Sequence, residues 1–153
     1  MRNWSLTLMT IITLCAACTE GKVYHHYNHT PVGGWEKVDT LVFDVPAMKE
    51  QGLYGTVVGL RITNGYPFMG LSLIVEQTVY PSQRRRIDTL NCKLIDKDGT
   101  PKGQGVSYYQ YRFQLSQMSL AQHDSLHITI RHDMKREILP GIADIGIAVN
   151  KLR

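Results

Sequence analysis

The sequence Tyr-Tyr-Gln-Tyr-Arg-Phe-Gln-Leu, residues 108–115, places an aromatic or aliphatic side chain at every second position from 109 to 115. Side chains of an extended strand point alternately to opposite faces, so this stretch predicts a β-strand with one buried face. The same period of two recurs in six further runs, at 41–45, 57–62, 71–79, 89–94, 126–131 and 144–150. A weaker run at 23–27 adds a short first strand.

These runs favour an all-β fold. No stretch of 10–15 residues with helical periodicity lies between them, which argues against βαβ units. Short segments at 47–51 and 115–123 can each form one helical turn. The expected architecture is a two-sheet antiparallel β-sandwich, a single domain that follows a signal peptide and a short tether.

The composition agrees with one ordinary globular domain. The chain has 153 residues, of which 43% are hydrophobic and 20% charged, enough for a single core. Disorder, a collagen-like fibre and a multi-span membrane protein do not fit these values. The formal charge of +4 reflects 17 Lys and Arg against 13 Asp and Glu. This excess is modest, and we expect no nucleic-acid partner.

The N-terminus has the three parts of an export signal. A short head containing Arg2 is followed by a mainly apolar segment from Leu6 and a small-residue exit at Ala16 and Ala17. The apolar segment is shorter than the roughly 20 residues that a membrane-spanning helix needs. These features fit both an ordinary secretory signal and a lipoprotein signal.

The sequence Leu14-Cys15-Ala16-Ala17-Cys18 resembles the bacterial lipobox, in which small residues precede a cysteine that receives diacylglycerol and becomes the mature N-terminus. Cys15 follows the large Leu14, so Cys18 is the expected lipid acceptor. The predicted organisation is a signal peptide at 1–17, a lipidated N-terminus and tether at 18–34, and the β-sandwich domain at 35–153. Cys92 is then the one thiol left, and an inert core position is expected for it.

Catalytic and metal-binding signatures are weak. The sequence has no Gly-x-Ser-x-Gly elbow and no His-Glu-x-x-His pair. His25, His26 and His29 lie in the expected tether and indicate a solvated segment more than a metal site. The stretch 96–105 begins like a calcium loop but lacks its closing Glu, and Asp98-Gly99 favours a turn. We therefore expect no enzyme activity, no metal and no cofactor.

Two groups of residues offer a ligand or partner surface. Arg84, Arg85 and Arg86 form either a basic patch or, as we favour, a charged edge strand. Trp35, Tyr66 and Tyr108 belong to a set of aromatic residues that a sugar-binding platform could use, although strands also favour aromatics for packing. A glycan is accordingly kept as an alternative ligand.

The order of several short segments resembles the GldH family of gliding-motility lipoproteins of the Bacteroidetes. The matching residues are Gly34-Trp35, Asp39-Thr40-Leu41, Asn64-Gly65-Tyr66-Pro67-Phe68, Asp88-Thr89-Leu90, Asp98-Gly99 and the stretch from Gly141 to Gly146. The resemblance implies a lipid-anchored outer-membrane protein without enzyme activity, lipidated at Cys18 and working with other envelope proteins of a gliding and secretion apparatus. Only one acid, Glu20, follows the cysteine closely, which favours a periplasm-facing domain over a surface-exposed one.

Overall fold

The computed structural model describes residues 21–153, so the predicted signal peptide and Cys18 lie outside the described residues. The secondary structure of this part of the chain consists of strands, without a helix. The strands are β1 (Lys22–His29), β2 (Trp35–Glu36), β3 (Leu41–Val45), β4 (Gly52–Thr63), β5 (Gly70–Tyr80), β6 (Arg84–Lys93), β7 (Tyr108–Leu120), β8 (Ser125–His132), β9 (Ile138–Leu139) and β10 (Ile142–Lys151). Residues 21–153 accordingly hold no helix that could cross a membrane.

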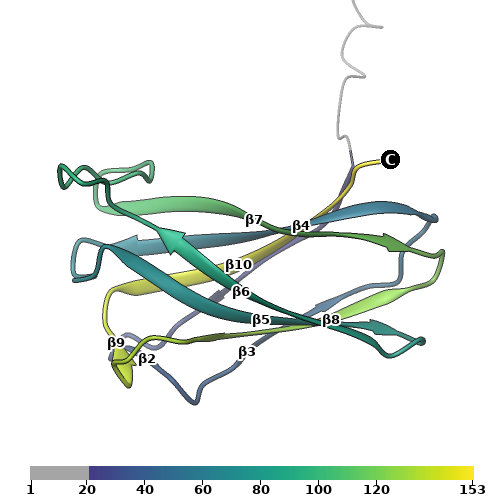
Figure 1. Ribbon diagram of the computed structural model, residues 1–153, viewed down its shortest axis with the longest axis horizontal. Helices are drawn as coiled ribbons and strands as arrows, with labels where there is room; N and C mark the ends of the chain where they lie inside the picture. The colour runs from purple at the N-terminus through teal and green to yellow at the C-terminus, as the bar shows by residue number, and fades with distance from the viewer. Residues whose placement is uncertain (1–20) are drawn as a thin grey trace, which may run out of the picture.

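Two four-stranded antiparallel sheets stack face to face (Figure 1). The first sheet has the strand order β1-β10-β4-β7, and the second has the order β3-β8-β5-β6. A two-stranded ribbon of β2 and β9 lies at one end of the sandwich. The predicted all-β sandwich is confirmed.

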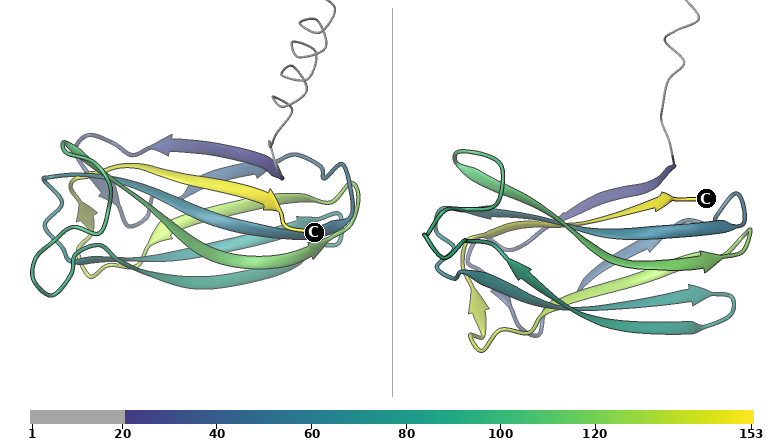
Figure 2. Two further views of the ribbon diagram at one scale, coloured as in Figure 1. Left: turned by 90° about the horizontal axis from the view of Figure 1, so that it is seen from above. Right: turned by 45° about the horizontal axis from the view of Figure 1, so that its top comes forward.

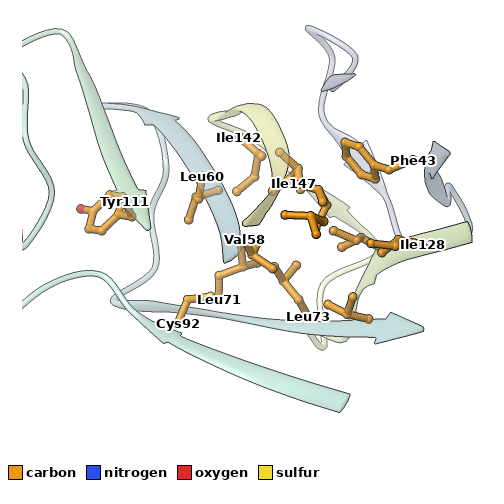
Figure 3. Packing of buried hydrophobic residues seen from close by; sticks show 14 of the residues in the cluster. Phe43, Val58, Leu60, Leu71, Leu73, Cys92, Tyr111, Ile128, Ile142 and Ile147 are labelled. Atoms are coloured by element: carbon orange, nitrogen blue, oxygen red, sulfur yellow. The ribbon is translucent and has the colours of Figure 1, made fainter. Parts of the chain in front are cut away.

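The core fills the space between the two inner faces. Val58 and Ile147 of the first sheet and Leu73 and Ile128 of the second are each fully buried, and Figure 3 shows these side chains converging between the sheets. Burial of one such side chain contributes about 1.5–3 kcal/mol to folding. The period of two in the sequence therefore reflects alternation between this core and the outer faces.

The strand at 108–115 continues further than its pattern indicates. β7 runs to Leu120 and pairs with β4 along its whole length, with a bulge where the register shifts between Thr56 and Val57. The helical turn expected at 115–123 was wrong, because the bulge lets both strands continue their pairing past the irregular position. The turn expected at 47–51 is also absent; there the amide of Met48 donates to the carbonyl of Asp124 across the sandwich end at 2.7 Å.

The segment expected as a tether differs most from the structure. Residues 22–29 form β1, which pairs antiparallel with β10 from Lys22↔Asn150 to His29↔Asp144. Val23 and Tyr24 pack against the core, which gives the strand a buried side despite its polar composition. The weak first strand is confirmed, and residues 22–29 belong to the first sheet instead of a tether.

The first described residue and the C-terminus lie at the same end of the sandwich (Figure 2). The amide of Lys151 donates to the carbonyl of Gly21 at 2.6 Å. The long loop between β6 and β7, residues 94–107, lies at the opposite end, on the left of Figure 1. The length of β10, ten residues at about 3.3 Å each, separates these ends by about 30 Å.

Candidate interaction surface

Two of the aromatic residues expected at a binding surface are core residues. Trp35 has no exposed surface, and its indole Nε1 donates to the carbonyl of Asp39 at 3.0 Å. Tyr66 is buried, and its hydroxyl donates to the carbonyl of Gly70 at 2.8 Å. Their expected place on a ligand surface was wrong, because each ring fills the core while its polar atom bonds to nearby backbone.

Tyr108 is 56% exposed at the beginning of β7, and the three arginines begin β6. Arg84 reaches Ser119, near the other end of β7, where its Nη2 donates to the carbonyl at 2.8 Å. Eleven residues of strand separate Tyr108 from Ser119, which is more than about 30 Å. The structure therefore does not bring the predicted residues together into one surface.

The arginines of β6 are paired locally. Arg85 forms a hydrogen bond of 2.6 Å to Glu76 on β5, and Arg86 binds Asp88 with its Nε at 2.7 Å. The hydrogen bond to Asp88 raises the pKa of Arg86 above its usual value. β6 is the edge of its sheet, as predicted, and exposed ion pairs of this kind contribute about 0–1 kcal/mol each.

Cys92 and the histidines of β1 do not form a reactive site. Cys92 is buried, and desolvation raises the pKa of its thiol to about 12. The rings of His26 and Phe43 meet edge to face with centroids 6.4 Å apart, while His29 contacts Asp144. Residues 21–153 contain no cluster of three or more His, Cys, Asp or Glu side chains placed to hold a metal ion.

The outer face of the first sheet has a feature that the sequence did not reveal. Tyr27 of β1 lies across Gly146 of β10 and Gly59 of β4, where added Cβ atoms would be 2.6 and 2.3 Å from its side chain. The guanidinium carbon of Arg61 lies 4.1 Å from the centre of the Tyr27 ring. Only the pairing of three strands brings these residues into contact, so no local signal in the sequence could find them.

A second feature, the basic groove, lies between the β6–β7 loop and the edge of β7. Its volume is about 530 Å³, and its lining includes Lys93, Lys102, Gln104, Gln110, Arg112 and Phe113. Tyr111 forms its inner wall: the ring stacks near Phe113 with centroids 6.1 Å apart, and the hydroxyl donates to the carbonyl of Leu94 at 3.0 Å. These contacts hold the wall of the groove in place.

The basic groove carries positive charge. Lys93, Lys102 and Arg112 line it, and no carboxylate does. Asp96 lies beside it, 3.4 Å from the Nζ of Lys93 and 3.2 Å from that of Lys102, and Lys102 is the main cause of its lowered pKa. One carboxylate faces two ammonium groups, so the groove favours an anionic ligand. The lysines are visible in the sequence, but the conformation of the β6–β7 loop determines that they line the same groove as Arg112.

Comparisons with known proteins cover nearly the whole chain. The family model described as GldH lipoprotein matches residues 22–149. The gliding motility lipoprotein GldH of Flavobacterium johnsoniae is 28% identical over 163 residues, which include 99% of this chain and 98% of that protein. This match extends across the N-terminal segment as well as the sandwich.

Similarity to solved structures is confined to the strand arrangement. The mosquito-larvicidal Cry4Aa toxin from Bacillus thuringiensis matches with a TM-score of 0.47 and 12% identity, over 77% of this chain and 19% of the toxin chain. A family 35 carbohydrate binding module from Clostridium thermocellum matches with a TM-score of 0.38 and 11% identity, over 82% of this chain and 89% of the module. At these values neither likeness bears on function.

The family model covers β1 and every later strand, β10 up to Val149, and so takes in both sheets and the basic groove. The resemblance noted in the short segments of the sequence is thereby confirmed over the folded part of the chain. This chain belongs to the GldH lipoprotein family.

Proposed function

We propose that this protein is a membrane-anchored lipoprotein of the cell envelope that serves a gliding and secretion apparatus by binding other proteins and catalyses no reaction. The observation that carries the proposal is the full-length likeness to the gliding motility lipoprotein of Flavobacterium johnsoniae. The basic groove on the described surface also supports the proposal, because it is open to solvent and carries positive charge. The alternative of sugar binding through exposed aromatics retains only Tyr108 of its three named residues, because the rings of Trp35 and Tyr66 are buried.

Cys18 is the proposed lipid attachment site, at the outer membrane and with the domain facing the periplasm. Gly21, the first described residue, is three positions after Cys18, and a fully extended chain spans at most about 3.6 Å per residue. The sandwich would therefore lie within about 11 Å of its lipid. The end formed by Gly21 and Lys151 would face the membrane, and the β6–β7 loop would point away from it.

Labelling with radioactive palmitate tests the anchor. The wild-type chain is expected to incorporate label and to sediment with membranes, and Cys18→Ser is expected to do neither. Cys15→Ser is the matched control, because it changes the neighbouring cysteine and should leave labelling intact. Retention of label by Cys18→Ser would refute the lipid attachment at this residue.

Purification from detergent-solubilised envelopes tests the role. An affinity-tagged wild-type chain, produced in its own host, is expected to bring down other proteins required for gliding or secretion, whereas the unanchored Cys18→Ser chain should recover far less of them. Deletion of the gene should also abolish colony spreading or export of secreted proteins. Normal spreading and normal export in the deletion strain would contradict the proposed role.

A further inference from the structure

The edge of β7 is open where it borders the basic groove. β7 is the outermost strand of the first sheet. Gln110 and Gln104 exchange two backbone hydrogen bonds, of 2.9 and 3.1 Å, on the side of β7 that faces away from β4. In an antiparallel strand the N–H and C=O groups of alternate residues point to the same side, so those of Arg112 also point outward. Among residues 21–153, no strand pairs with Arg112 on that side.

Both ends of this open stretch are closed by the protein itself. The bridge between Gln104 and Gln110 closes it at one end, and the guanidinium of Arg84 donates to the carbonyl of Ser119 at the other. The side-chain amide of Asn28 donates to the carbonyl of Val42 at 2.9 Å and so occupies one acceptor on the edge strand β3. Exposed strand edges are often blocked in this way, and among residues 21–153 no such backbone contact blocks Arg112.

The charge around the open stretch indicates what it binds. Lys93 and Lys102 approach it from the loop side, and Arg112 lies on the strand itself. Arg112 also lines a small hollow with His25 and Tyr27 on the outer face of the sheet, and Asp96 offsets one of the two lysine charges. An added strand would thus meet backbone donors and acceptors along its length and cations beside it.

We propose that an extended acidic segment of a partner protein binds in the basic groove as an added β-strand beside Arg112–Gln114 of β7. Its backbone would pair with the N–H and C=O of Arg112, and its carboxylates would meet Lys93 and Lys102. Strand addition of this kind gains affinity from main-chain hydrogen bonds and specificity from side-chain sites. The inference deepens the proposed function, on which it rests, by naming the chemistry of the partner.

The position of the groove favours a protein segment over anionic lipid as the source of negative charge. Gln104 and Lys102 lie at the end of the sandwich that carries Thr63 and Ile142, whereas Gly21 pairs with Lys151 at the other end. Nine residues of β10 separate Ile142 from Lys151, about 30 Å. An anchor close to Gly21 would hold the basic groove well above the lipid headgroups.

Fluorescence anisotropy with the full-length lipoprotein in detergent tests the proposal. The probe is a labelled nine-residue peptide of alternating Glu and Val. The first control is a peptide of the same length in which Pro replaces two central Val residues, which removes backbone donors and keeps the charge. A Lys-Val peptide is the second control. We expect the Glu-Val peptide to bind, the Pro peptide to bind at least about tenfold more weakly, and the Lys-Val peptide not to bind.

Variants of the protein locate the binding. The double change Lys93→Gln and Lys102→Gln should weaken binding at least about tenfold, whereas Lys97→Gln, an exposed lysine of the same loop that does not line the groove, should leave it unchanged. Arg112→Pro should also weaken it, because it removes an outward N–H that pairs with no other strand. Circular dichroism establishes that each variant is folded.

The results that would refute strand addition differ from those that would refute the proposed envelope role. No binding of the Glu-Val peptide at millimolar concentration, or equal binding of the Pro peptide, would refute strand addition. Equal binding by wild type and the double lysine variant would refute this groove as the site. Palmitate labelling and co-purification would still support the envelope role in each of these cases.

Discussion

His132 shows how a single buried side chain makes stability depend on pH. It has no exposed surface, its ring meets that of Trp35 edge to face, and its Nε2 lies 3.2 Å from the Trp35 carbonyl. Its Nδ1 accepts the amide of Met134 at 3.4 Å. These contacts suit the neutral ring, with the proton on Nε2. Burial, and then the charge of Lys37, lower the pKa of His132, against the opposing effects of the Trp35 carbonyl and of Glu137.

The sign of the pH effect follows from this lowered pKa. The unfolded chain takes up a proton on His132 as the pH falls below about 6.5, whereas the folded protein resists it. The free energy of unfolding should therefore decrease between pH 7.5 and pH 5. Urea unfolding at several pH values measures this, and His132→Gln, which cannot titrate, should lose less stability over the same range. An equal loss in both proteins would contradict the prediction.

Trp35 and Cys92 show what the sequence can and cannot say about one residue. The place of Cys92 between Leu90 and Leu94 on the apolar face of a run indicated a buried thiol, and the structure agrees. Trp35 lies in β2, which has two residues and is too short to show an alternation that would indicate the buried face. Its pairing partner in β9 is more than a hundred residues away in the sequence. Local alternation decides burial inside a long strand, whereas tertiary contacts decide it in a short one.

Gln77 is the polar exception on the inner face of β5. It shares that face with Leu73, Val75 and Val79, and it is fully buried. Its Oε1 accepts the hydroxyl of Thr56 at 3.0 Å, and its Nε2 donates to the hydroxyl of Ser116 at 2.9 Å. Thr56 and Ser116 face each other beside the bulge of β4 and β7, so Gln77 links the two sheets at the irregular position.

Replacing Gln77 by Leu should destabilise the protein by about 1–3 kcal/mol, because two buried hydroxyls lose their partner. The triple change Gln77→Leu, Thr56→Val and Ser116→Ala should recover much of that loss, since it removes the unpaired groups together. Denaturant unfolding of the wild type, Gln77→Leu, the triple variant and the single variants Thr56→Val and Ser116→Ala measures both effects. The costs of Thr56→Val and Ser116→Ala could instead simply add to that of Gln77→Leu in the free energy of unfolding of the triple variant. That result would show that these three side chains do not link the sheets.

The contact of β1 with the glycines of β4 and β10 gives a prediction at the scale of strands. A Cβ at Gly59 would lie 2.3 Å from the Tyr27 hydroxyl oxygen, so Gly59→Ala must displace the ring and loosen β1. We expect a loss of about 1–3 kcal/mol in the free energy of unfolding. In the background of Tyr27→Ala, the same change should cost much less. Gly33→Ala is the control, because a Cβ at Gly33 meets nothing within 4 Å.

The arrangement of the whole molecule was only partly accessible from the sequence. Alternation gave the strands and the two-layer class, because each strand has one face in the common core. Alternation predicted neither the order β1-β10-β4-β7 nor the groove beside β7, because paired residues such as Lys22 and Asn150 lie up to 128 positions apart in the sequence. Over β1 the alternation of apolar and polar residues is weak. His25 and Tyr27 on its outer face pack beside glycines, so this face has the residue types of neither a buried nor a solvent-exposed strand face.

The N-terminal boundary of the fold leads to the last prediction. A chain beginning at residue 35 lacks β1, which leaves the edge of β10 unpaired and removes Val23 and Tyr24 from the core. We expect the chain 35–153 to aggregate or to lose several kcal/mol of stability, roughly the burial of two apolar side chains together with a strand of hydrogen bonds. The chain 21–153 should unfold at the same urea concentration as the full-length Cys18→Ser protein. Equal unfolding midpoints for 35–153 and 21–153 would show that β1 is a tether after all, and the lipid would then hold the sandwich on a longer and looser segment.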